Sequence, residues 1–585
     1  MIDVESQHSA PSLRGDGGRF PGSLAAETRS TRVYRMERPL RLVACAASGL
    51  LLTAAFPPLE WSWTAWFALV PMLVFGLGST GRDRLAGGAA FGLAHCLTLF
   101  SWLNEIGFFA GFLLGAVVAL FPAAWYVFVR PVVVRESPPG VSSTGCSGWL
   151  FELLAVLFSA ALWVALEWVR SWLFTGLPWG FAGVSQWQNL HLLPLTTLTG
   201  VYGLSFLIIA VNASLARVVL AAWRRSWPCS LRGLAMFAGV AVLSAAAPWV
   251  ADKVHPAPPA AESRVVRIGA VQGNIPQARG RADEMLPVAL QAYDEVSRRL
   301  VREDSPDLLL WPETAVPAAL RYNQAFADTV DALCRDTRTP LLLGSVDYRY
   351  LPPVDSLPPG EEEPPPVGFN CAFLLGADGR ILEHYDKTHL VPFGEYTPFE
   401  ELLPFLVEWI GMGRSLTQGR EFTLFNLPGG IRTGINICYE DCFPHISRAF
   451  TRRGAEVLAT ITNDAWYAQS AGSRQHMIHA VFRAVENRRP LMRSGNNSDT
   501  CLILADGSVE GLLCDPDTGS RFVRAGRTYE LHPPGTLPLT FYTRYGDVFA
   551  WLCCAVVVAA AVPTLTRFLR RKVRLYTVVR GVAPQ

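Results

Sequence analysis

Apolar runs long enough to cross a bilayer stand on both sides of one long polar segment, which limits this chain to a membrane-anchored fold. Of its 585 residues, 50% are hydrophobic and only 17% are charged, and the apolar residues are gathered in these runs. We therefore expect an integral membrane protein with about eight transmembrane helices, seven before the polar segment and one after it. Their expected positions are near residues 40–57, 62–79, 86–103, 109–129, 149–169, 192–216, 233–250 and 546–566.

Arginine is distributed unevenly among the connections between these runs. Alternate connections carry it, and the intervening short ones carry almost none, Arg170 being the exception. Because basic residues favour the cytoplasmic side, we expect both termini in the cytoplasm and the polar segment outside. The first run lacks a small-residue cleavage site and is interpreted as an anchor. The basic connections hold Arg82 and Arg84, then Arg130 and Arg135, then Arg217, Arg224, Arg225 and Arg232, and finally Arg567, Arg570, Arg571, Lys572 and Arg574.

These patterns divide the chain into seven segments. They are a disordered cytoplasmic tail (1–38), seven transmembrane helices (39–250), a linker (251–264), a catalytic domain (265–530), a second linker (531–545), the C-terminal transmembrane helix (546–566) and a basic cytoplasmic tail (567–585).

Within the polar segment, short apolar runs alternate with helical stretches, which predicts one α/β domain with a sizeable core. The turn sequences at 377–380 and 427–430 predict hairpins, and the proline- and glutamate-rich stretch 352–367 is interpreted as an inserted surface loop. Strands are expected at 265–271, 308–311, 341–346, 372–375, 431–437, 457–461 and 491–494, and helices at 284–302, 323–337, 444–453 and 473–488.

Cys438 follows one of these apolar runs, at the predicted C-terminal end of a buried strand. A helix that begins there would lower the pKa of the thiol and donate backbone hydrogen bonds, as a nucleophile requires. A small apolar residue that caps the strand explains the same position equally well. Cys371 and Cys442 are interpreted as core residues.

Two charged residues in the same segment complement this cysteine. Glu313 also follows a predicted strand, where partial burial would suit a general base, although a helix N-terminal charge is an alternative. Lys387 is the only lysine between Lys253 and Lys572, and a compact ammonium suits a developing oxyanion; a surface lysine is the alternative.

Several other functions lack support in the sequence. The near-equal balance of 51 basic and 49 acidic residues shows no nucleic-acid footprint, and no phosphate-binding glycine loop is present. His476 and His479 lie one helical turn apart without a metal-binding motif, so a solvated helix face is expected rather than a metal site. The aromatic loop from Gly176 to Trp187 is interpreted as an interfacial belt with some substrate contact. No cofactor and no metal are expected.

At these residues the sequence resembles the nitrilase superfamily, in which a glutamate, a lysine and a cysteine occur in this order on an α-β-β-α sandwich. It is most similar to the membrane-embedded apolipoprotein N-acyltransferase family, over nearly the whole chain. The strings at 271–277, 390–396 and 463–467 make the resemblance specific. The family commonly has a tryptophan within a few residues after Gln277. This chain departs from that pattern, because its residues up to Arg281 include no tryptophan.

The resemblance implies transfer of a fatty acyl chain from a membrane phospholipid to the amino group of a diacylglyceryl-cysteine in an apolipoprotein. It implies a bacterial inner membrane location with a periplasmic catalytic domain. Glu313 would be the general base, Lys387 the oxyanion cation and Cys438 the nucleophile. The resemblance further implies that Glu395 supports the base and the lysine, that Tyr439 provides contacts beside the nucleophile, and that Glu440 is a supporting carboxylate.

Two rival functions use the same features differently. A membrane-anchored nitrilase-type amidase would pass the acyl group to water through the same three residues. A transport or scaffold protein would only bind through its α/β domain, but its membrane runs contain few ionisable residues of the kind that line a substrate pathway.

Overall fold

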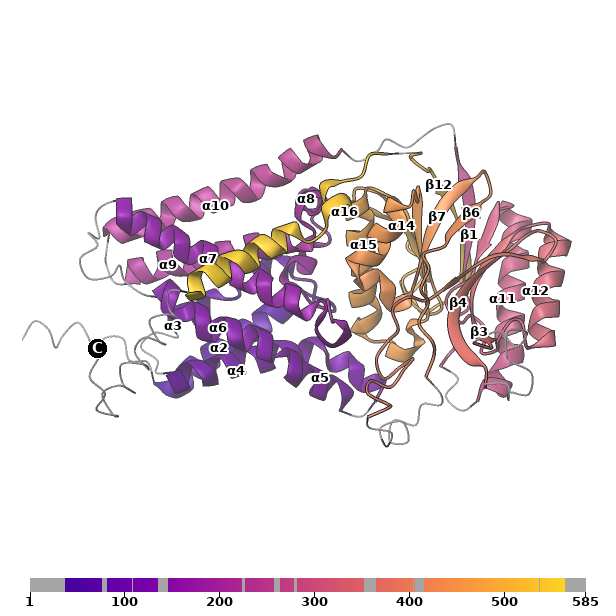
Figure 1. Ribbon diagram of the computed structural model, residues 1–585, viewed down its shortest axis with the longest axis horizontal. Helices are drawn as coiled ribbons and strands as arrows, with labels where there is room; N and C mark the ends of the chain where they lie inside the picture. Colours follow the sequence, from indigo (N-terminus) through magenta and orange to yellow (C-terminus); the bar gives the residue numbers. More distant parts are fainter. Residues whose placement is uncertain are drawn as a thin grey trace, which may run out of the picture.

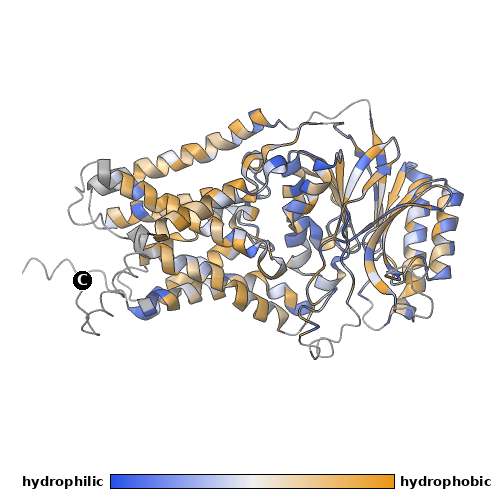
Figure 2. Ribbon diagram, in the orientation of Figure 1, coloured by the Kyte–Doolittle hydropathy of each residue, from blue (hydrophilic) through white to orange (hydrophobic). Residues whose placement is uncertain are grey.

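The computed structural model describes residues 37–75, 81–107, 109–134, 146–223, 227–256, 264–277, 281–351, 365–402, 405, 415–535 and 537–562. The C-terminal tail 567–585, nearly all of the N-terminal tail 1–38 and most of the stretch 352–367 lie outside these residues. The described chain forms an apolar helical bundle at one end and a mixed α/β domain at the other (Figures 1 and 2).

The bundle is built from helices that pack closely through glycine. A Cβ atom at Gly49 of α2 would lie 2.5 Å from the carbonyl oxygen of Phe91, and one at Gly92 of α4 would lie 2.4 Å from that of Ala119. Small residues at such contacts let membrane helices approach backbone to backbone. The helices are α2 (Arg38–Thr53), α3 (Val70–Phe75), α4 (Gly81–Leu99), α5 (Ala110–Val118), α6 (Leu120–Val134), α7 (Cys146–Arg170), α8 (Thr196–Thr199), α9 (Val201–Trp223) and α10 (Trp227–Val254).

Within the described residues, four helical stretches are long and apolar enough to cross a membrane, so the expected count of about eight is not confirmed. Two further apolar helices, Ser62–Phe75 and Val548–Val562, are shorter over their described residues. Helix α4 has three charged residues in its first turn, at positions 82–84, which interrupts its apolar run. The four stretches are Ala110–Val129, Trp149–Arg170, Val201–Trp223 and Gly233–Val254.

Two helix boundaries differ from the sequence expectation. The expected span at 192–216 begins as short turns, and its long helix α9 starts only at Val201, after Gly200 in the left-handed region (φ +63°). Helix α10 continues to Val254, into the stretch expected to be a linker. The expected linker 531–545 contains the short helix α16 (Phe541–Tyr545).

The α/β domain contains two six-stranded sheets. Their strand orders are β12-β1-β2-β3-β4-β5 and β11-β10-β9-β8-β7-β6. In each sheet three strands are parallel, β1 to β3 and β7 to β9, and the flanking strands pair antiparallel. The strands are β1 (Val266–Gln272), β2 (Leu308–Leu310), β3 (Leu341–Arg349), β4 (Val367–Leu375), β5 (Ile381–Asp386), β6 (Leu424–Leu427), β7 (Ile431–Ile437), β8 (Val457–Thr462), β9 (Leu491–Gly495), β10 (Cys501–Ile503), β11 (Val509–Glu510) and β12 (Ala525–Leu531).

Helices cover the outer face of each sheet and complete four layers (Figure 1). Helices α11 (Ala282–Asp304) and α12 (Gln324–Thr337) cover the first sheet, and α14 (Pro444–Arg452) and α15 (Ala471–Asn487) cover the second. Every residue of β2 and of β8 is buried because both faces of these central parallel strands are covered. This is the mixed α/β sandwich that the sequence predicts.

Each strand expected from the sequence has its counterpart in the structure, and both predicted turns are hairpins. Gly379 adopts φ +80° between β4 and β5, and Gly429 and Gly430 have positive φ between β6 and β7. Strand β4 begins at Val367, inside the stretch interpreted as a surface loop. The edge strands β5, β6, β11 and β12, together with β10, are additions to the prediction.

Helix α15 joins the α/β domain to the bundle through Gln475. Its side-chain oxygen accepts hydrogen bonds from the indole N–H groups of Trp102 (3.0 Å) and Trp179 (2.9 Å). Its amide nitrogen donates to the carbonyl oxygens of Pro57 (3.1 Å) and Leu99 (3.4 Å). One buried amide therefore holds three separate bundle segments against this helix.

Candidate active site

The structure places Glu313, Lys387 and Cys438 just after the C-terminal ends of β2, β5 and β7. These strands belong to both sheets, so the three residues meet where the sheets face each other. A glycine makes room for the first of them: a Cβ atom at Gly344 would lie 2.5 Å from the Cα of Glu313.

The ammonium group of Lys387 lies between two carboxylates. Its Nζ is 3.2 Å from Oε1 of Glu313 and 2.8 Å from Oε1 of Glu395. The side-chain amide of Asn370 donates to both of these oxygens, at 2.7 Å and 2.6 Å. Burial alone would lower the pKa of Lys387, but Glu313 and Glu395 raise it well above its ordinary value. The lysine is therefore a permanent cation in this site.

Backbone donors fix the two carboxylates that flank this lysine. The N–H of Asn463 donates to Oε2 of Glu313 (2.9 Å), and the N–H of Val391 donates to Oε2 of Glu395 (2.8 Å). In each carboxylate, one oxygen thus accepts a hydrogen bond from Lys387 and the other accepts one from a main-chain N–H. This arrangement holds both groups in a fixed orientation.

Cys438 is buried and adopts a left-handed backbone conformation, with φ +54°. Such a conformation in a residue with a side chain stores strain and is concentrated at functional sites. Burial and the charge of Glu313 raise the pKa of the thiol, while the charges of Lys387 and His476 act in the opposite direction. The resting thiol is therefore protonated.

Glu440 connects the nucleophile turn η7 (Cys438–Cys442) to the segment that follows Lys387. Its Oε1 accepts hydrogen bonds from the backbone and hydroxyl of Thr388 (2.7 Å and 2.8 Å), from the N–H of His389 (3.2 Å) and from the hydroxyl of Tyr385 (2.8 Å). Its Oε2 accepts from the N–H of Ile437 (2.8 Å). This fully buried carboxylate therefore fixes the nucleophile relative to the lysine.

Tyr439 faces the membrane bundle. Its hydroxyl donates to the carbonyl oxygen of Gly176 (3.3 Å), and its ring packs near those of Trp179, His389 and Phe443. The residue after the nucleophile is thus in contact with a loop of the bundle.

That loop is buried rather than interfacial, so the interpretation as an exposed aromatic belt is wrong. Trp179 and Phe181 are each 2% exposed, and Trp187 is 9% exposed. The ring of Trp179 lies 5.6 Å from that of His476 and 5.2 Å from that of His479. The aromatic residues seal the contact between bundle and α/β domain, with only Trp172 and Phe174 of the preceding turn strongly exposed.

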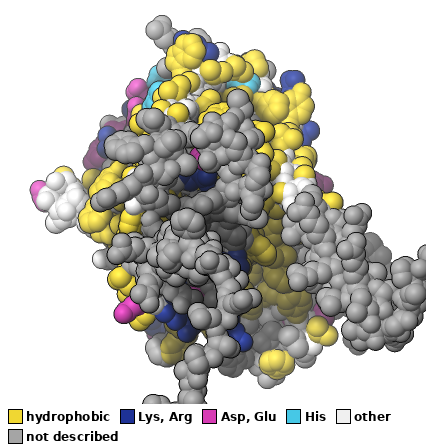
Figure 3. Space-filling model, turned by 90° about the vertical axis from the view of Figure 1, so that its left-hand side faces the viewer, with side chains coloured by type: hydrophobic (Ala, Val, Ile, Leu, Met, Phe, Trp, Pro, Cys, Tyr) yellow, Lys and Arg dark blue, Asp and Glu magenta, His cyan; other side chains and the backbone are white. Residues whose placement is uncertain are grey.

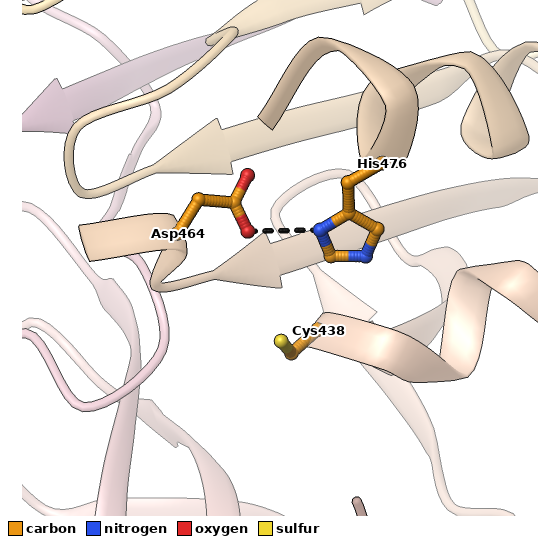
Figure 4. A group of neighbouring side chains, drawn as sticks. All are labelled: Cys438, Asp464 and His476. Atoms are coloured by element: carbon orange, nitrogen blue, oxygen red, sulfur yellow. Dashed lines mark hydrogen bonds and ion pairs between the residues drawn. The ribbon is translucent and has the colours of Figure 1, made fainter. Parts of the chain in front are cut away.

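The expectation that His476 and His479 form a solvated helix face is also wrong, because both are buried. Helix α15 is covered by the sheet on one side and by the bundle on the other. Nδ1 of His476 forms a hydrogen bond with Oδ1 of Asp464 (2.8 Å), and its Nε2 lies 3.1 Å from Oδ1 of Asp441. Figure 4 shows His476, Asp464 and Cys438 converging from three elements.

The atoms around His476 include two sets with the chemistry of zinc ligands. Cys438, Asp464 and His476 form one set, and Asp441, Cys442 and His476 form the other, with ligand atoms within 4.8 Å of one another. However, the guanidinium of Arg493 already binds Asp441 (3.0 Å) and Asp464 (2.9 Å). The carboxylates are thus neutralised by side chains of the protein, and the donor set fits an internal ion-pair network better than a metal.

Cys371 and Cys442 are buried free thiols, in agreement with their interpretation as core residues. Asn370 and Arg493 were missed in the sequence, although each is a polar residue inside an otherwise apolar strand. Asp441 and Asp464 were missed as well, and their position directly after β7 and β8 is the only local sign of them.

Comparison with known proteins identifies the family to which a chain with this fold and site belongs. Residues 267–518 match the Carbon-nitrogen hydrolase family model, and residues 48–214 match the Apolipoprotein N-acyltransferase N-terminal domain model. The structure of an amidase from Nesterenkonia sp. AN1 aligns with a TM-score of 0.34 and 17% identity, covering 49% of this chain and 95% of that chain.

Full-length relatives are more specific. An apolipoprotein N-acyltransferase of Geobacter metallireducens is 32% identical over 543 residues, which are 90% of this chain and 95% of the relative. One of Rhizobium rhizogenes is 32% identical over 510 residues, 82% of this chain and 88% of the relative. The chain belongs to the apolipoprotein N-acyltransferase family.

Proposed function

We propose that this protein transfers a fatty acyl chain from a membrane phospholipid, through a thioester on Cys438, to the amino group of a diacylglyceryl-cysteine at the N-terminus of an apolipoprotein. Its membership of the N-acyltransferase family supports lipoprotein N-acylation. The phospholipid donor and the thioester go beyond what family membership supports and are part of the proposal.

One observation carries the proposal: the nucleophile lies at the junction of the α/β domain and the membrane bundle. Tyr439, the next residue, bonds Gly176 of a bundle loop, and Trp179 packs beside it. A lipid that lies in the bilayer can reach such a junction without leaving the membrane. Apolar walls also keep water scarce, which favours an amine over water as the acyl acceptor.

In the proposed first half-reaction, Glu313 takes the proton from Cys438 as the sulfur attacks the ester carbon of the phospholipid. Two of the three N–H donors of Lys387 bind Glu313 and Glu395, which leaves one for the oxygen that becomes negative. The carbon–oxygen bond then breaks, and Glu313 returns the proton to the departing oxygen of the lysophospholipid.

In the second half-reaction, the acceptor amine attacks the thioester and loses a proton to Glu313. The carbon–sulfur bond breaks, the amide is released, and the proton returns to Cys438. Glu395, Tyr439 and Glu440 hold this machinery in place. The same pocket thus serves both lipids in turn, as ping-pong kinetics require.

The basic side chains support one orientation of the protein in the membrane. Arg38 and Arg41 of α2, Arg84 of α4 and Arg217 of α9 lie near helix ends far from the α/β domain. Figure 3 looks onto this end and shows Lys and Arg side chains among hydrophobic ones. We place this end in the cytoplasm of a bacterium, with both termini, and the catalytic domain on the periplasmic face of the inner membrane.

The test supplies labelled phospholipid to the full-length protein with and without a diacylated acceptor peptide. Without acceptor, wild type is expected to accumulate a hydroxylamine-sensitive acyl group on Cys438, and Cys438→Ser is not. Cys334→Ser, a buried thiol of α12, is the matched control and is expected to behave as wild type. Label released as free fatty acid at equal rates with and without peptide would instead indicate a hydrolase.

A further inference from the structure

Four buried charged side chains meet beside Cys438, and none of them has a role in the reaction as described above. They are Asp441 of η7, Asp464 of η8 (Asp464–Tyr467), His476 of α15 and Arg493 of β9. Each side chain is fully buried. His476 bridges the two aspartates from one side, and Arg493 bridges them from the other.

The charges of this network balance only when His476 is protonated. Two carboxylates oppose one guanidinium, so a neutral imidazole would leave one uncompensated negative charge in a buried site. An imidazolium makes the network neutral. Burial alone would lower the pKa of His476, but Asp441 and Asp464 raise it well above its ordinary value.

The sulfur of Cys438 lies within 4.8 Å of this ring. At that distance a charge acts strongly on an ionisable thiol. The charged groups that act on the thiol are Glu313 and Asp464, which disfavour a thiolate, and Lys387 and His476, which favour it. The other groups around the ring of His476 are Trp179, Tyr467, His479, Cys442 and Arg493.

We propose that His476 is a positioning residue that holds a fixed positive charge beside Cys438 and stabilises its thiolate in both half-reactions. The proton that leaves the sulfur goes to Glu313, and His476 keeps both of its own. The charge acts when the thiolate forms and again when the amine displaces it from the thioester. The inference rests on the proposed function for its role in turnover, but its charge effect is measurable without lipid.

The test is alkylation of Cys438 by iodoacetamide in the full-length protein, followed by mass spectrometry between about pH 7 and about pH 9. Below the pKa of the thiol the rate follows the thiolate fraction. In His476→Gln we expect the pKa of the Cys438 thiol to rise, which lowers the alkylation rate about tenfold at each pH.

His479→Gln is the matched control. His479 is a buried histidine one turn along the same helix, and burial lowers its pKa to about 3, so it is neutral in this range. Its substitution removes a ring of the same size without removing a charge, and the alkylation rate is expected to stay within about twofold of wild type.

The direction of the change in alkylation rate distinguishes loss of the His476 charge from a general loosening of the site. Loosening of the site would hydrate Cys438, lower the pKa that burial has raised, and speed alkylation, whereas loss of the charge slows it. An unchanged or faster rate in folded His476→Gln therefore overturns the proposal.

If His476→Gln does not fold, ring ¹⁵N NMR of wild type decides. The proposal requires one buried histidine that keeps both ring protons at about pH 8 and sits in contact with Asp464. Neutral rings for all buried histidines would overturn it. Because iodoacetamide and NMR involve no lipid, a failure of the acyl-transfer proposal leaves these readouts unaffected.

Discussion

The main-chain N–H of Asn463 donates a 2.9 Å hydrogen bond to Oε2 of Glu313. The end of β8 in one sheet thus orients the carboxylate that follows β2 in the other. A glutamine can accept this bond through its single amide oxygen, but its NH2 group then faces the ammonium of Lys387, so Glu313→Gln removes the proposed base together with one acceptor.

We expect Glu313→Gln to lose some stability but stay folded, and to acylate Cys438 about 10²–10⁴-fold more slowly, the usual contribution of a general base. Acyl-enzyme formation from labelled phospholipid measures this. Glu303→Gln, an exposed glutamate of α11, is the control with an unchanged rate. An acylation rate within about threefold of wild type would remove Glu313 from the mechanism.

Lys387→Met is expected to slow acylation by about 10²–10³-fold through loss of the oxyanion donor. It also leaves Glu313 and Glu395 facing each other without a cation, which is expected to lower the melting temperature. Adding Glu395→Gln to this variant should restore stability but not acylation. Recovery of both in the double variant would show that the lysine acts only by neutralising charge.

Glu440→Gln should be destabilising, because one oxygen that accepts buried hydrogen bonds becomes a donor. The unsatisfied groups are expected to cost about 1–3 kcal/mol in free energy of unfolding. Chemical denaturation in detergent measures this, with Glu510→Gln on the exposed face of β11 as the control. Wild-type stability would show that Glu440 is not required to hold the nucleophile turn.

Stability should depend on pH through the network at His476. Its pKa is raised above the ordinary 6.5, so its stabilisation is complete below pH 6.5 and is lost as the pH rises through the raised value. Burial alone would raise the pKa of Asp464, but His476 and Arg493 lower it to about 2; its contribution is complete above its ordinary pKa of 3.8 and is lost as the pH falls towards 2.

The advantage of wild type over His476→Gln in melting temperature is therefore expected to be largest between about pH 4 and about pH 6.5 and to shrink in alkali. His479→Gln should show the opposite trend, because a histidine whose pKa is lowered destabilises the fold as the pH falls below 6.5. Parallel curves for the two variants would contradict this assignment.

Topology can be tested with a thiol reagent that does not cross membranes, in a Cys514→Ser background that removes the exposed thiol found among the described cysteines. In spheroplasts, a cysteine at Glu303 is expected to react and one at Arg82 to stay protected until the membrane is opened. Both positions are exposed. The reverse pattern would invert the proposed orientation.

The sequence was informative where apolar runs end. Cys438 and Glu313 could be located because buried strands are visible as apolar runs and their C-terminal ends face one edge, whereas Lys387 was found as the only lysine between Lys253 and Lys572. The role of Asn370 could not, because an amide within a strand becomes meaningful only when β5 is paired beside β4 and brings Lys387 near.

His476 was misjudged for a related reason. Its helix was expected to have one solvent-exposed face, but the bundle covers that face. The contact between helix and bundle joins segments that are far apart in the chain. The transmembrane count is not confirmed, because some runs, such as α4, combine apolar residues with charges or are short over their described residues. Local pattern does not reveal which surfaces another part of the same chain will cover.

The amide of Gln475 has a consequence for the enzyme as a whole. Its partners Trp102 and Trp179 belong to the bundle, and its neighbour His476 lies against the nucleophile. Part of the wall of the active site is therefore contributed by segments outside the α/β domain. A domain cut free of its membrane helices would retain Glu313, Lys387 and Cys438 and yet lose the part of their surroundings that the bundle contributes.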